Sequence, residues 1–308
     1  MSPPPGAPLP EPRGPAPRAA TVLLLREEDG RPEVLLTKRA AGLSFMAGLW
    51  VFPGGRVEAS DESPAIAARM VATRLDSPRL RMLDLAGTPL APDTAQGLHV
   101  AACRETFEEC GVLLARPRVG PGTCAPEQVA RLAAARPATI TAAAFLQLLE
   151  REDLLLEADR LVYWAHWITP SVEKKRFDTR FFAVQVPAGQ DASVDRSELT
   201  HHAWLGEAAI AAALGSGEMR MAPPTLATLQ DVWRSCERHG SLARMLEAGR
   251  ARYVPPIMPK IVPVDAGAFE TVMPWDEQYA SLSGEGAVAA EGYPDYLTAL
   301  PSRRQYRP

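Results

Sequence analysis

Short apolar runs predict several β-strands in the first part of the chain. Residues 19–26 and 33–39 are rich in Val, Leu and Thr, and residues 28–30 between them (Glu-Asp-Gly) are typical of a turn. We therefore predict a hairpin here. Residues 50–52 predict a third, short strand, which ends at Pro53 because proline cannot donate a hydrogen bond to a neighbouring strand.

Apolar residues at helical spacing predict helices further along the chain, and these helices alternate with more strands. Residues 77–97 contain prolines and glycines and are predicted to be a loop. The alternation indicates mixed α/β layers. The predicted helices are residues 62–75, 126–136, 141–151 (capped by Thr141), 206–214, 224–239 and 242–250, and the further strands are 161–168, 180–186 and 199–204. His166 and the tryptophans beside it are interpreted as sheet side chains.

The two ends of the chain differ in composition from its middle. Residues 1–18 are rich in proline and have little to bury, which predicts a disordered leader. Residues 19–250 carry the predicted elements and form the main domain. In residues 251–308 prolines recur and periodicity is poor, so we predict an irregular extension that wraps the domain or contributes to a homodimer. Its distinctive patch, residues 273–276, is alternatively a short strand and turn.

Composition excludes several classes of protein. The net charge of −4 and the pI near 5.8 argue against a general nucleic-acid binder. No apolar run approaches the ~20 residues that a membrane span needs, and the proline-rich start lacks the apolar region of a signal peptide. The four cysteines include no C-x-x-C pair, which indicates neither a disulfide framework nor a zinc site. The chain ends Tyr-Arg-Pro, without a peroxisomal tripeptide, so a cytoplasmic location is expected.

Residues 101–112 carry the strongest chemical signal. Glu105, Glu108 and Glu109 are spaced so that a helix would place them on one face. Like charges at this spacing repel each other, whereas a divalent cation would hold them together, and hard oxygen ligands suit Mg²⁺ or Mn²⁺. Arg104 lies four residues before Glu108 and is expected to pair with it. The alternative is a solvated acidic face closed by a C-terminal glycine, Gly111.

Two features flank this acidic face. Val100, Cys103, Phe107 and Cys110 form an apolar stripe at helical spacing, which is expected to pack on a core. Upstream, residues 52–55 read Phe-Pro-Gly-Gly, and glycines allow a backbone to approach a ligand closely. A carbonyl of Gly55 is a candidate metal ligand. The alternative is an ordinary pair of turn glycines.

Together, the two segments resemble the Nudix box, G-x5-E-x7-R-E-U-x-E-E-x-G-U, in which U is aliphatic. Gly55 matches its first glycine, and Asp61 stands where the family has Glu. Arg69 is at the expected position, but no carboxylates follow it. The second half of the box begins only at Arg104, so an insertion of roughly residues 62–97 splits the motif. That half matches as Arg104, Glu105, Glu108, Glu109, Gly111 and Val112, with Thr106 in place of an aliphatic residue.

A split box is similar to that of the nucleoside diphosphate-linked moiety X motif 19 branch of the Nudix hydrolases, whose animal members are peroxisomal acyl-coenzyme A diphosphatases. Residues 44–48, 176–182 and 223–225 also resemble pieces of this branch, and residues 35–55 partly resemble the coenzyme A signature of Nudix enzymes. The resemblance covers about residues 19–250. It implies an αβα sandwich with a mixed sheet, and an insertion beside the active site that is either a lid or a surface excursion.

The resemblance also implies a metal-dependent hydrolase with a small-molecule diphosphate as substrate. It would cleave coenzyme A or acyl-coenzyme A to 3′,5′-ADP and a 4′-phosphopantetheine, with Mg²⁺ or Mn²⁺ as cofactor. The expected metal ligands are Glu105, Glu108, Glu109 and Gly55. Glu108 is alternatively the group that orients the attacking water. Arg104 is expected to fix Glu108 and Asp61.

A general base outside the box and a basic site for the 3′-phosphate remain to be assigned. Candidates for the base are Glu198, Asp178 and Glu173. Candidates for substrate binding are Lys38, Arg39, Arg176 and, by stacking, Phe45, with a solvated charge run or a core position as the alternatives. Two other functions stay open: a pyrophosphatase for ADP-ribose or another nucleoside diphosphate, and a non-catalytic nucleotide-binding regulator.

Overall fold

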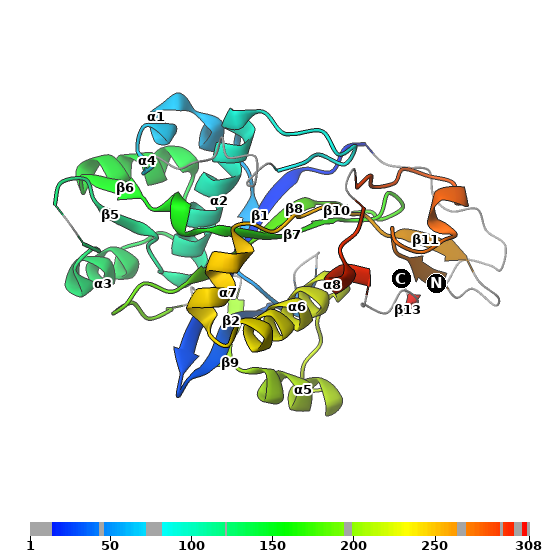
Figure 1. Cartoon of the computed structure of the whole chain (residues 1–308). Helices are drawn as coiled ribbons and strands as arrows, with labels where there is room; N and C mark the ends of the chain where they lie inside the picture. Colours follow the sequence, from blue (N-terminus) through cyan, green and yellow to red (C-terminus); the bar gives the residue numbers. More distant parts are fainter. Residues whose placement is uncertain are drawn as a thin grey trace.

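A mixed eight-stranded sheet lies between two layers of helices in the computed structural model (Figure 1). The model describes residues 14–42, 46–71, 82–120, 122–193, 199–263, 269–289, 292–298 and 304–306. The strand order is β10-β7-β8-β1-β2-β3, with β4 beside β1 and β9 beside β2. These strands are β1 (Arg18–Glu28), β2 (Arg31–Arg39), β3 (Trp50–Val51), β4 (Gly54–Arg56), β7 (Val162–Ile168), β8 (Asp178–Gln185), β9 (Leu199–Leu205) and β10 (Pro256–Ile257).

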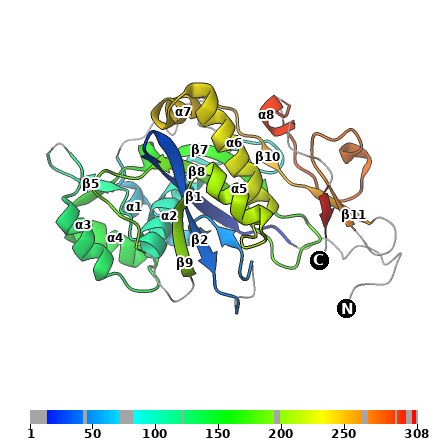
Figure 2. The ribbon, with the colours of Figure 1, turned by 90° about the horizontal axis from the view of Figure 1, so that it is seen from below.

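Helices cover both faces of this sheet, as the αβα expectation requires (Figure 2). On one face lie α1 (Pro64–Ala67), α2 (Pro92–Cys110), α3 (Pro126–Ala134) and α4 (Ala142–Arg151), and on the other α5 (Glu207–Gly215), α6 (Pro223–His239) and α7 (Leu242–Gly249). The smaller elements of the described residues include the 3₁₀ turns η1 (Ala59–Glu62), η3 (Ala158–Arg160) and η5 (Tyr279–Ser281) and the short helix α8 (Asp295–Thr298). The strands β5 (Ala115–Pro117) and β6 (Leu154–Leu156) form a pair. The strands β11 (Lys260–Pro263), β12 (Phe269–Val272) and β13 (Arg304–Tyr306) form a separate three-stranded sheet.

The central strand β1 is buried on both sides. Val22 and Leu24 pack toward α2, whereas Leu23 and Leu25 pack toward α6 and α7, and all four are fully buried. A strand covered on both faces reads as a continuous apolar run, which is the pattern seen in the sequence. Each such side chain contributes roughly 1.5–3 kcal/mol when it is fully buried.

The first hairpin is confirmed, but its two strands separate toward their far ends. Near the turn β1 pairs with β2, from Leu25 opposite Val34 to Glu28 opposite Arg31. Further on, β1 pairs with β4 and β2 pairs with β3 instead. Residues 50–56 therefore fill the gap between β1 and β2, and this arrangement places the Gly-Gly pair in the middle of the sheet.

The predicted boundaries around the insertion are wrong in two places. The helix predicted at 62–75 is reduced to the turn η1 and the single turn α1, after which Met70 forms a β-bridge with Leu156. Residues 72–81 lie outside the described part. The loop predicted to continue to residue 97 ends earlier, because α2 starts at Pro92. Proline is favoured in the first turn of a helix, where its missing N–H has no partner to lose.

The other predicted elements between residues 126 and 250 are confirmed to within a few residues. Thr141 caps α4 as predicted, with its hydroxyl accepting from Ala144 N at 3.2 Å. His166 is a fully buried sheet residue and the neighbouring Trp164 and Trp167 are also buried. Within the described residues, no helix is both long and apolar enough to cross a membrane.

The C-terminal extension is more regular than predicted. β10 joins the edge of the main sheet beside β7, and Met273 and Leu297 enter the core beneath α6. Residues 273–276 follow β12 and form a turn, in which Met273 N donates to Asp276 Oδ2 at 2.8 Å, so the strand-and-turn alternative describes them. The extension thus wraps its own domain. Of the predicted leader, residues 1–13 lie outside the described part and β1 begins at Arg18.

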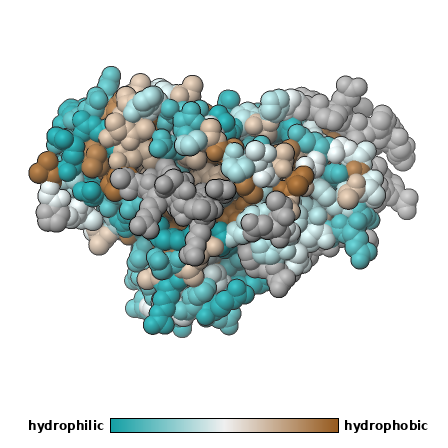
Figure 3. Space-filling model, turned by 45° about the horizontal axis from the view of Figure 1, so that its top comes forward, coloured by the Kyte–Doolittle hydropathy of each residue, from teal (hydrophilic) through white to brown (hydrophobic). Residues whose placement is uncertain are grey.

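Hydrophilic residues lie over much of the face shown in Figure 3, and apolar residues are scattered among them. Among the described residues, the large hydrophobic side chains that are exposed are Val119 and Val288. Most other large hydrophobic side chains of the described chain are buried, many of them in the two cores that flank the sheet.

Candidate functional site

The two halves of the split motif meet in space. Gly54 N donates to Glu109 Oε2 at 2.9 Å, although the residues are 55 positions apart. At Gly55, a Cβ atom would lie 2.4 Å from Glu105 Oε1, which is far inside van der Waals contact. A larger residue here would displace the Glu105 carboxylate, because the backbone of β4 lies directly against it. The Gly-Gly pair is thus more than an ordinary turn.

Helix α2 presents its residues as the spacing predicts. Val100, Cys103, Phe107 and Cys110 are fully buried in the core cluster. Gly111 ends the helix in the left-handed conformation, with φ of 67°, and its N–H donates to Phe107 O at 2.9 Å. The apolar stripe and the C-terminal glycine are therefore both confirmed.

The carboxylates do not form a solvated face. Glu105 is only 8% exposed, and Glu108 and Glu109 are half-buried. Burial raises the pKa of Glu105 to about 7, with Arg104 opposing the shift and Glu108 adding to it. Burial and then the charge of Glu105 raise the pKa of Glu109 to about 8. Such carboxylates need a positive counter-charge to stay ionised near neutral pH.

Arg104 anchors the site from within the core. Its guanidinium has five N–H groups, and all of them have acceptors. Nε and Nη2 donate to the two oxygens of Asp61 at 3.1 and 2.9 Å, and Nη1 donates to Glu105 Oε1 at 2.8 Å. The other two acceptors are the carbonyls of Arg56 and Ile140, at 3.0 and 3.2 Å. Its donors are thus taken, and the predicted pairing with Glu108 is replaced by pairing with Asp61 and Glu105.

Asp61 takes the place of the motif's first Glu and is 1% exposed. Burial raises its pKa, while the hydrogen bonds from Arg104 act in the opposite direction. The turn η1 supplies a further donor, Glu58 N, at 2.8 Å from Asp61 Oδ2. Asp61 and Arg104 therefore lock the first half of the motif to the second.

Two contributors were missed in the sequence. Glu108 Oε2 accepts from Ile140 N at 2.5 Å, and Ile140 belongs to the segment that begins α4. Glu58 lies nearby, with Oε1 4.0 Å from Arg104 Nη1. Glu58 is three residues before Asp61 and closes a capping box with it, which was the one local signal available. A backbone donor such as Ile140 N leaves no signal in the sequence.

Two neighbouring cations on β2 have different surroundings. The charge of Arg39 acts on Glu109 and lowers its pKa against the larger effects of burial and Glu105, so Arg39 lies close to the motif. Lys38 Nζ instead lies 6.0 Å from the ring centroid of Trp50. The structure thus brings Arg39 to the carboxylates and places Lys38 beside an aromatic ring.

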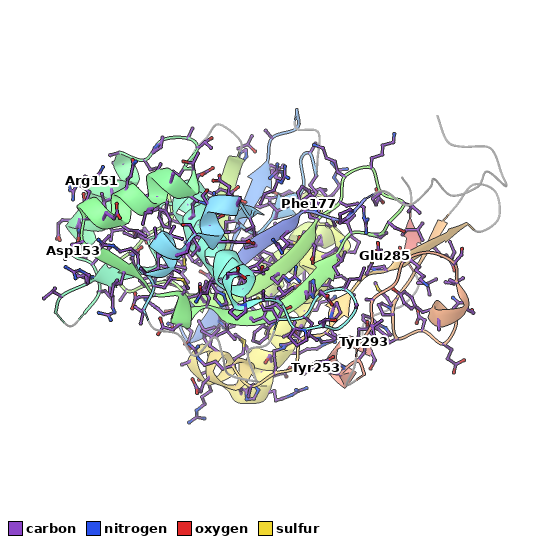
Figure 4. All side chains as sticks on the ribbon, turned by 90° about the horizontal axis from the view of Figure 1, so that it is seen from above. Arg151, Asp153, Phe177, Tyr253, Glu285 and Tyr293 are labelled. Carbon is purple, nitrogen blue, oxygen red and sulfur yellow. The ribbon has the colours of Figure 1, made fainter. Side chains whose placement is uncertain are left out.

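Arg176 has mainly structural contacts. It is 7% exposed, and it donates to Glu285 Oε2 at 3.0 Å in the C-terminal extension and to the carbonyl of Gly14 at 2.9 Å. Figure 4 labels Phe177, its neighbour, and Glu285 at this junction. These contacts tie the segment before β1 and the C-terminal extension to the β7–β8 connection, and they give no support to a role in substrate binding. Phe45 lies outside the described residues.

Of the candidates for the general base, Asp178 is held in a network of ionic hydrogen bonds. Asp178 binds His166 Nε2 and Arg180 Nη1, both at 2.6 Å. Burial opposes its charge, but the hydrogen bond from His166 and the charge of Arg180 hold the pKa of Asp178 at about 2, which makes it a weak base. Glu173 is half-buried in the connection between β7 and β8, and Glu198 lies outside the described residues.

The donor atoms fit a divalent cation in kind, although they are not gathered around one point. In the described part of the chain, no three His, Cys, Asp or Glu side chains are clustered as a ready metal site. Each carboxylate instead bonds to protein: Glu105 to Arg104, Glu108 to Ile140 N and Glu109 to Gly54 N. Carboxylate and carbonyl oxygens next to a glycine that leaves no space for a Cβ suit a hard cation.

Comparison with known proteins identifies the family of the chain. The sequence profile of the family described as NUDT19 Nudix domain matches residues 17–232. The chain is 29% identical over 283 residues to the human protein named acyl-coenzyme A diphosphatase NUDT19, covering 80% of this chain and 72% of that one. It is 28% identical to the Gallus gallus protein of the same name, covering 85% and 79%. A crystal structure of a Nudix hydrolase from Alicyclobacillus acidocaldarius superposes with a TM-score of 0.54 at 26% identity, over 70% of this chain and 90% of that one.

Proposed function

The chain belongs to the NUDT19 Nudix domain family, and from this premise we propose that it hydrolyses the diphosphate of coenzyme A or an acyl-coenzyme A. The products would be 3′,5′-ADP and 4′-phosphopantetheine or its acyl derivative. The observation that carries the proposal is the meeting of Gly54 and Gly55 with Glu109 and Glu105, because it rebuilds across the insertion a motif that is split in the sequence.

Nudix hydrolases generally use divalent metals, and we infer Mg²⁺ or Mn²⁺ for this one. Glu105 and Glu109, with the carbonyl of Gly55, would hold the cation, and Glu108 would bind it or orient the attacking water. The cation, when bound, neutralises the charge of the diphosphate and lowers the pKa of a bound water. The raised pKa values of Glu105 and Glu109 support this assignment, because a cation would add counter-charge to Glu109 and to Glu105, which Arg104 neutralises only in part.

The protein's own residues would fix and shield this chemistry. Arg104 holds Glu105 while its remaining donors bind Asp61 and two carbonyls, so Glu105 cannot swing away from β4. Arg39, whose charge reaches Glu109, would bind the diphosphate. Lys38, beside Trp50, would meet a phosphate further along the substrate, with the ring available for stacking.

The test is to incubate the purified protein with Mg²⁺ or Mn²⁺ and a panel of diphosphates, and to identify the products by mass. We expect coenzyme A or its acyl esters to give 3′,5′-ADP, and Glu109→Gln to abolish turnover with an unchanged Tm. Faster cleavage of ADP-ribose would replace this substrate with a nucleoside diphosphate. Tight nucleotide binding without any cleavage would indicate a regulator instead.

A further inference from the structure

The turn that begins α4 reaches into the motif from outside it. The backbone of Ile140 and Ala142 makes three hydrogen bonds to charged side chains of the site. Ile140 N donates to Glu108 Oε2 at 2.5 Å, and Ile140 O accepts from Arg104 Nη1 at 3.2 Å. Ala142 N donates to Glu58 Oε2 at 3.0 Å. Neither half of the Nudix box contains this turn.

Ile140 takes the place of a direct contact between Arg104 and Glu108. One residue binds both side chains, the carboxylate through its N–H and the guanidinium through its carbonyl. Ile140 is only 2% exposed, and its bond to Arg104 is buried, whereas its bond to Glu108 is partly buried. A backbone donor also has no rotamers, and a hydrogen bond to an ionised carboxylate is stronger than one between neutral groups. The position of the Glu108 carboxylate is therefore set by the main chain of another element.

The turn itself is held firmly. Thr141 Oγ1 accepts from Ala144 N and caps the helix, and Glu58 binds the next backbone N–H. One turn further along α4, Phe145 stacks on Phe107 of α2, with ring centroids 6.2 Å apart. The donor of Ile140 is thus fixed relative to α2 by contacts on both sides of it.

We propose that the Ile140 N–H is a positioning group for Glu108. It fixes the Glu108 carboxylate through Oε2, so that α4 forms part of the support of the metal site. The proposal rests on the metal role assigned to Glu108 under the proposed function. Hydrogen-bond partners of metal ligands typically change metal affinity by roughly 10- to 100-fold.

The experiment removes the donor and measures Mn²⁺ binding to the purified protein by electron paramagnetic resonance. We expect Ile140→Pro to weaken Mn²⁺ binding by roughly 10-fold, and Ile140→Val, which keeps the N–H, to leave it unchanged. Ala142→Pro is the matched control, because it removes the N–H that binds Glu58. Position 142 opens the helix, where proline is tolerated, and Thr141 before it has φ of −68° and ψ of 155°, as a residue preceding proline prefers.

A double-mutant cycle separates positioning from a general loss of structure. If Ile140 acts through Glu108, Ile140→Pro has no further effect on Mn²⁺ affinity in a Glu108→Ala background. The same loss in both backgrounds would overturn the proposal. Should Ile140→Pro fail to fold by its melting curve, replacement of the residue-140 amide by an ester removes only the N–H, and unchanged Mn²⁺ binding then overturns the proposal equally.

The outcome for Glu108 distinguishes this inference from the proposed function. If Glu108→Ala leaves Mn²⁺ binding unchanged, Glu108 is not a metal ligand, and the positioning role of Ile140 is refuted as well. If Glu108→Ala weakens Mn²⁺ binding and removal of the Ile140 N–H does not, the inference alone is overturned.

Discussion

Gly55 and Glu105 lie so close that a Cβ at position 55 would be 2.4 Å from Glu105 Oε1. We therefore expect Gly55→Ala to displace Glu105, to reduce turnover at least tenfold and to cost about 1–3 kcal/mol of stability, as overpacking of a filled site does. Turnover and urea unfolding measure the two effects. Gly42→Ala is the control, because no atom lies within 4 Å of its Cβ position. Equal behaviour of the two variants would contradict the packing of β4 on α2.

Arg104→Lys keeps a positive charge but loses the fork that binds Asp61 with two nitrogens. Because Arg104 and Asp61 are both buried, the acceptors that lysine leaves without a donor are expected to lower the free energy of unfolding by about 1–3 kcal/mol. Arg118→Lys is the matched control. Its ion pair with Asp153 is on the surface and screened by water, so its loss is expected to leave the free energy of unfolding nearly unchanged. Urea unfolding compares them, and similar values would refute the anchoring role of Arg104.

We expect the free energy of unfolding to fall in mild acid because of the buried His166. Burial, together with the charge of Arg180, lowers the pKa of His166 from 6.5 to about 4. The unfolded chain therefore binds a proton first, and the contribution of neutral His166 is fully present above pH 6.5 and is lost as the pH falls through 4. We expect wild type to lose about 3 kcal/mol more than His166→Gln between pH 7.5 and 4. The difference reports His166 together with its hydrogen-bonded partner Asp178, since groups elsewhere titrate in both proteins. If the free energy of unfolding changed equally with pH in wild type and His166→Gln, the contribution of His166 would be excluded.

Arg39→Ala tests the substrate side of the site. If Arg39 binds the diphosphate, its loss should raise KM by roughly 10- to 100-fold, the value of a charge-assisted hydrogen bond. The effect should be equal for coenzyme A and for dephospho-coenzyme A, which lacks the 3′-phosphate. Lys38→Ala is expected to affect coenzyme A more than its dephospho form. If instead Arg39→Ala affected coenzyme A more than its dephospho form and Lys38→Ala affected both equally, Lys38 would bind the diphosphate and Arg39 the 3′-phosphate.

For Arg176, in contrast to Arg39, we expect a substitution to change stability and not KM. Its guanidinium joins the C-terminal extension and the segment before β1 to the β7–β8 connection. We expect Arg176→Ala to lower the free energy of unfolding by about 1–2 kcal/mol, because it removes hydrogen bonds that join the two segments although Glu285 itself is half-exposed, and to leave KM for coenzyme A unchanged. A raised KM at unchanged stability would return Arg176 to the substrate site.

Local signals in the sequence were sufficient for most elements and for the carboxylates. The turn residues between β1 and β2, the hydroxyl of Thr141 and the glycine after Cys110 each act within a few residues, so their effects can be read from the sequence. The spacing of Glu105, Glu108 and Glu109 placed them on one helix for the same reason. The degree of their burial could not be predicted, because it depends on β4 and α4, which pack from elsewhere.

The missed features all depend on tertiary contacts. Residues 50–56 fill the gap between β1 and β2 only because those strands separate, and no local pattern announces that separation. Arg104 was expected to bind Glu108, one turn away on its helix. Instead it binds Asp61, 43 positions earlier, because the turn η1 delivers a buried carboxylate to it. The first turns of α2 are polar enough to resemble a loop in the sequence, and Pro92 marks their start.

The Arg104–Asp61 pair has one more consequence. Asp61 stands where the intervening segment leaves the motif, and Arg104 lies just past the point where the segment returns. The two side chains therefore fasten the root of an excursion, so the interrupted motif is continuous in three dimensions. Closing a longer loop costs only about 0.6 kcal/mol for each doubling of its length. The segment between Asp61 and Arg104 can therefore change in length and sequence without displacing the carboxylates of the motif.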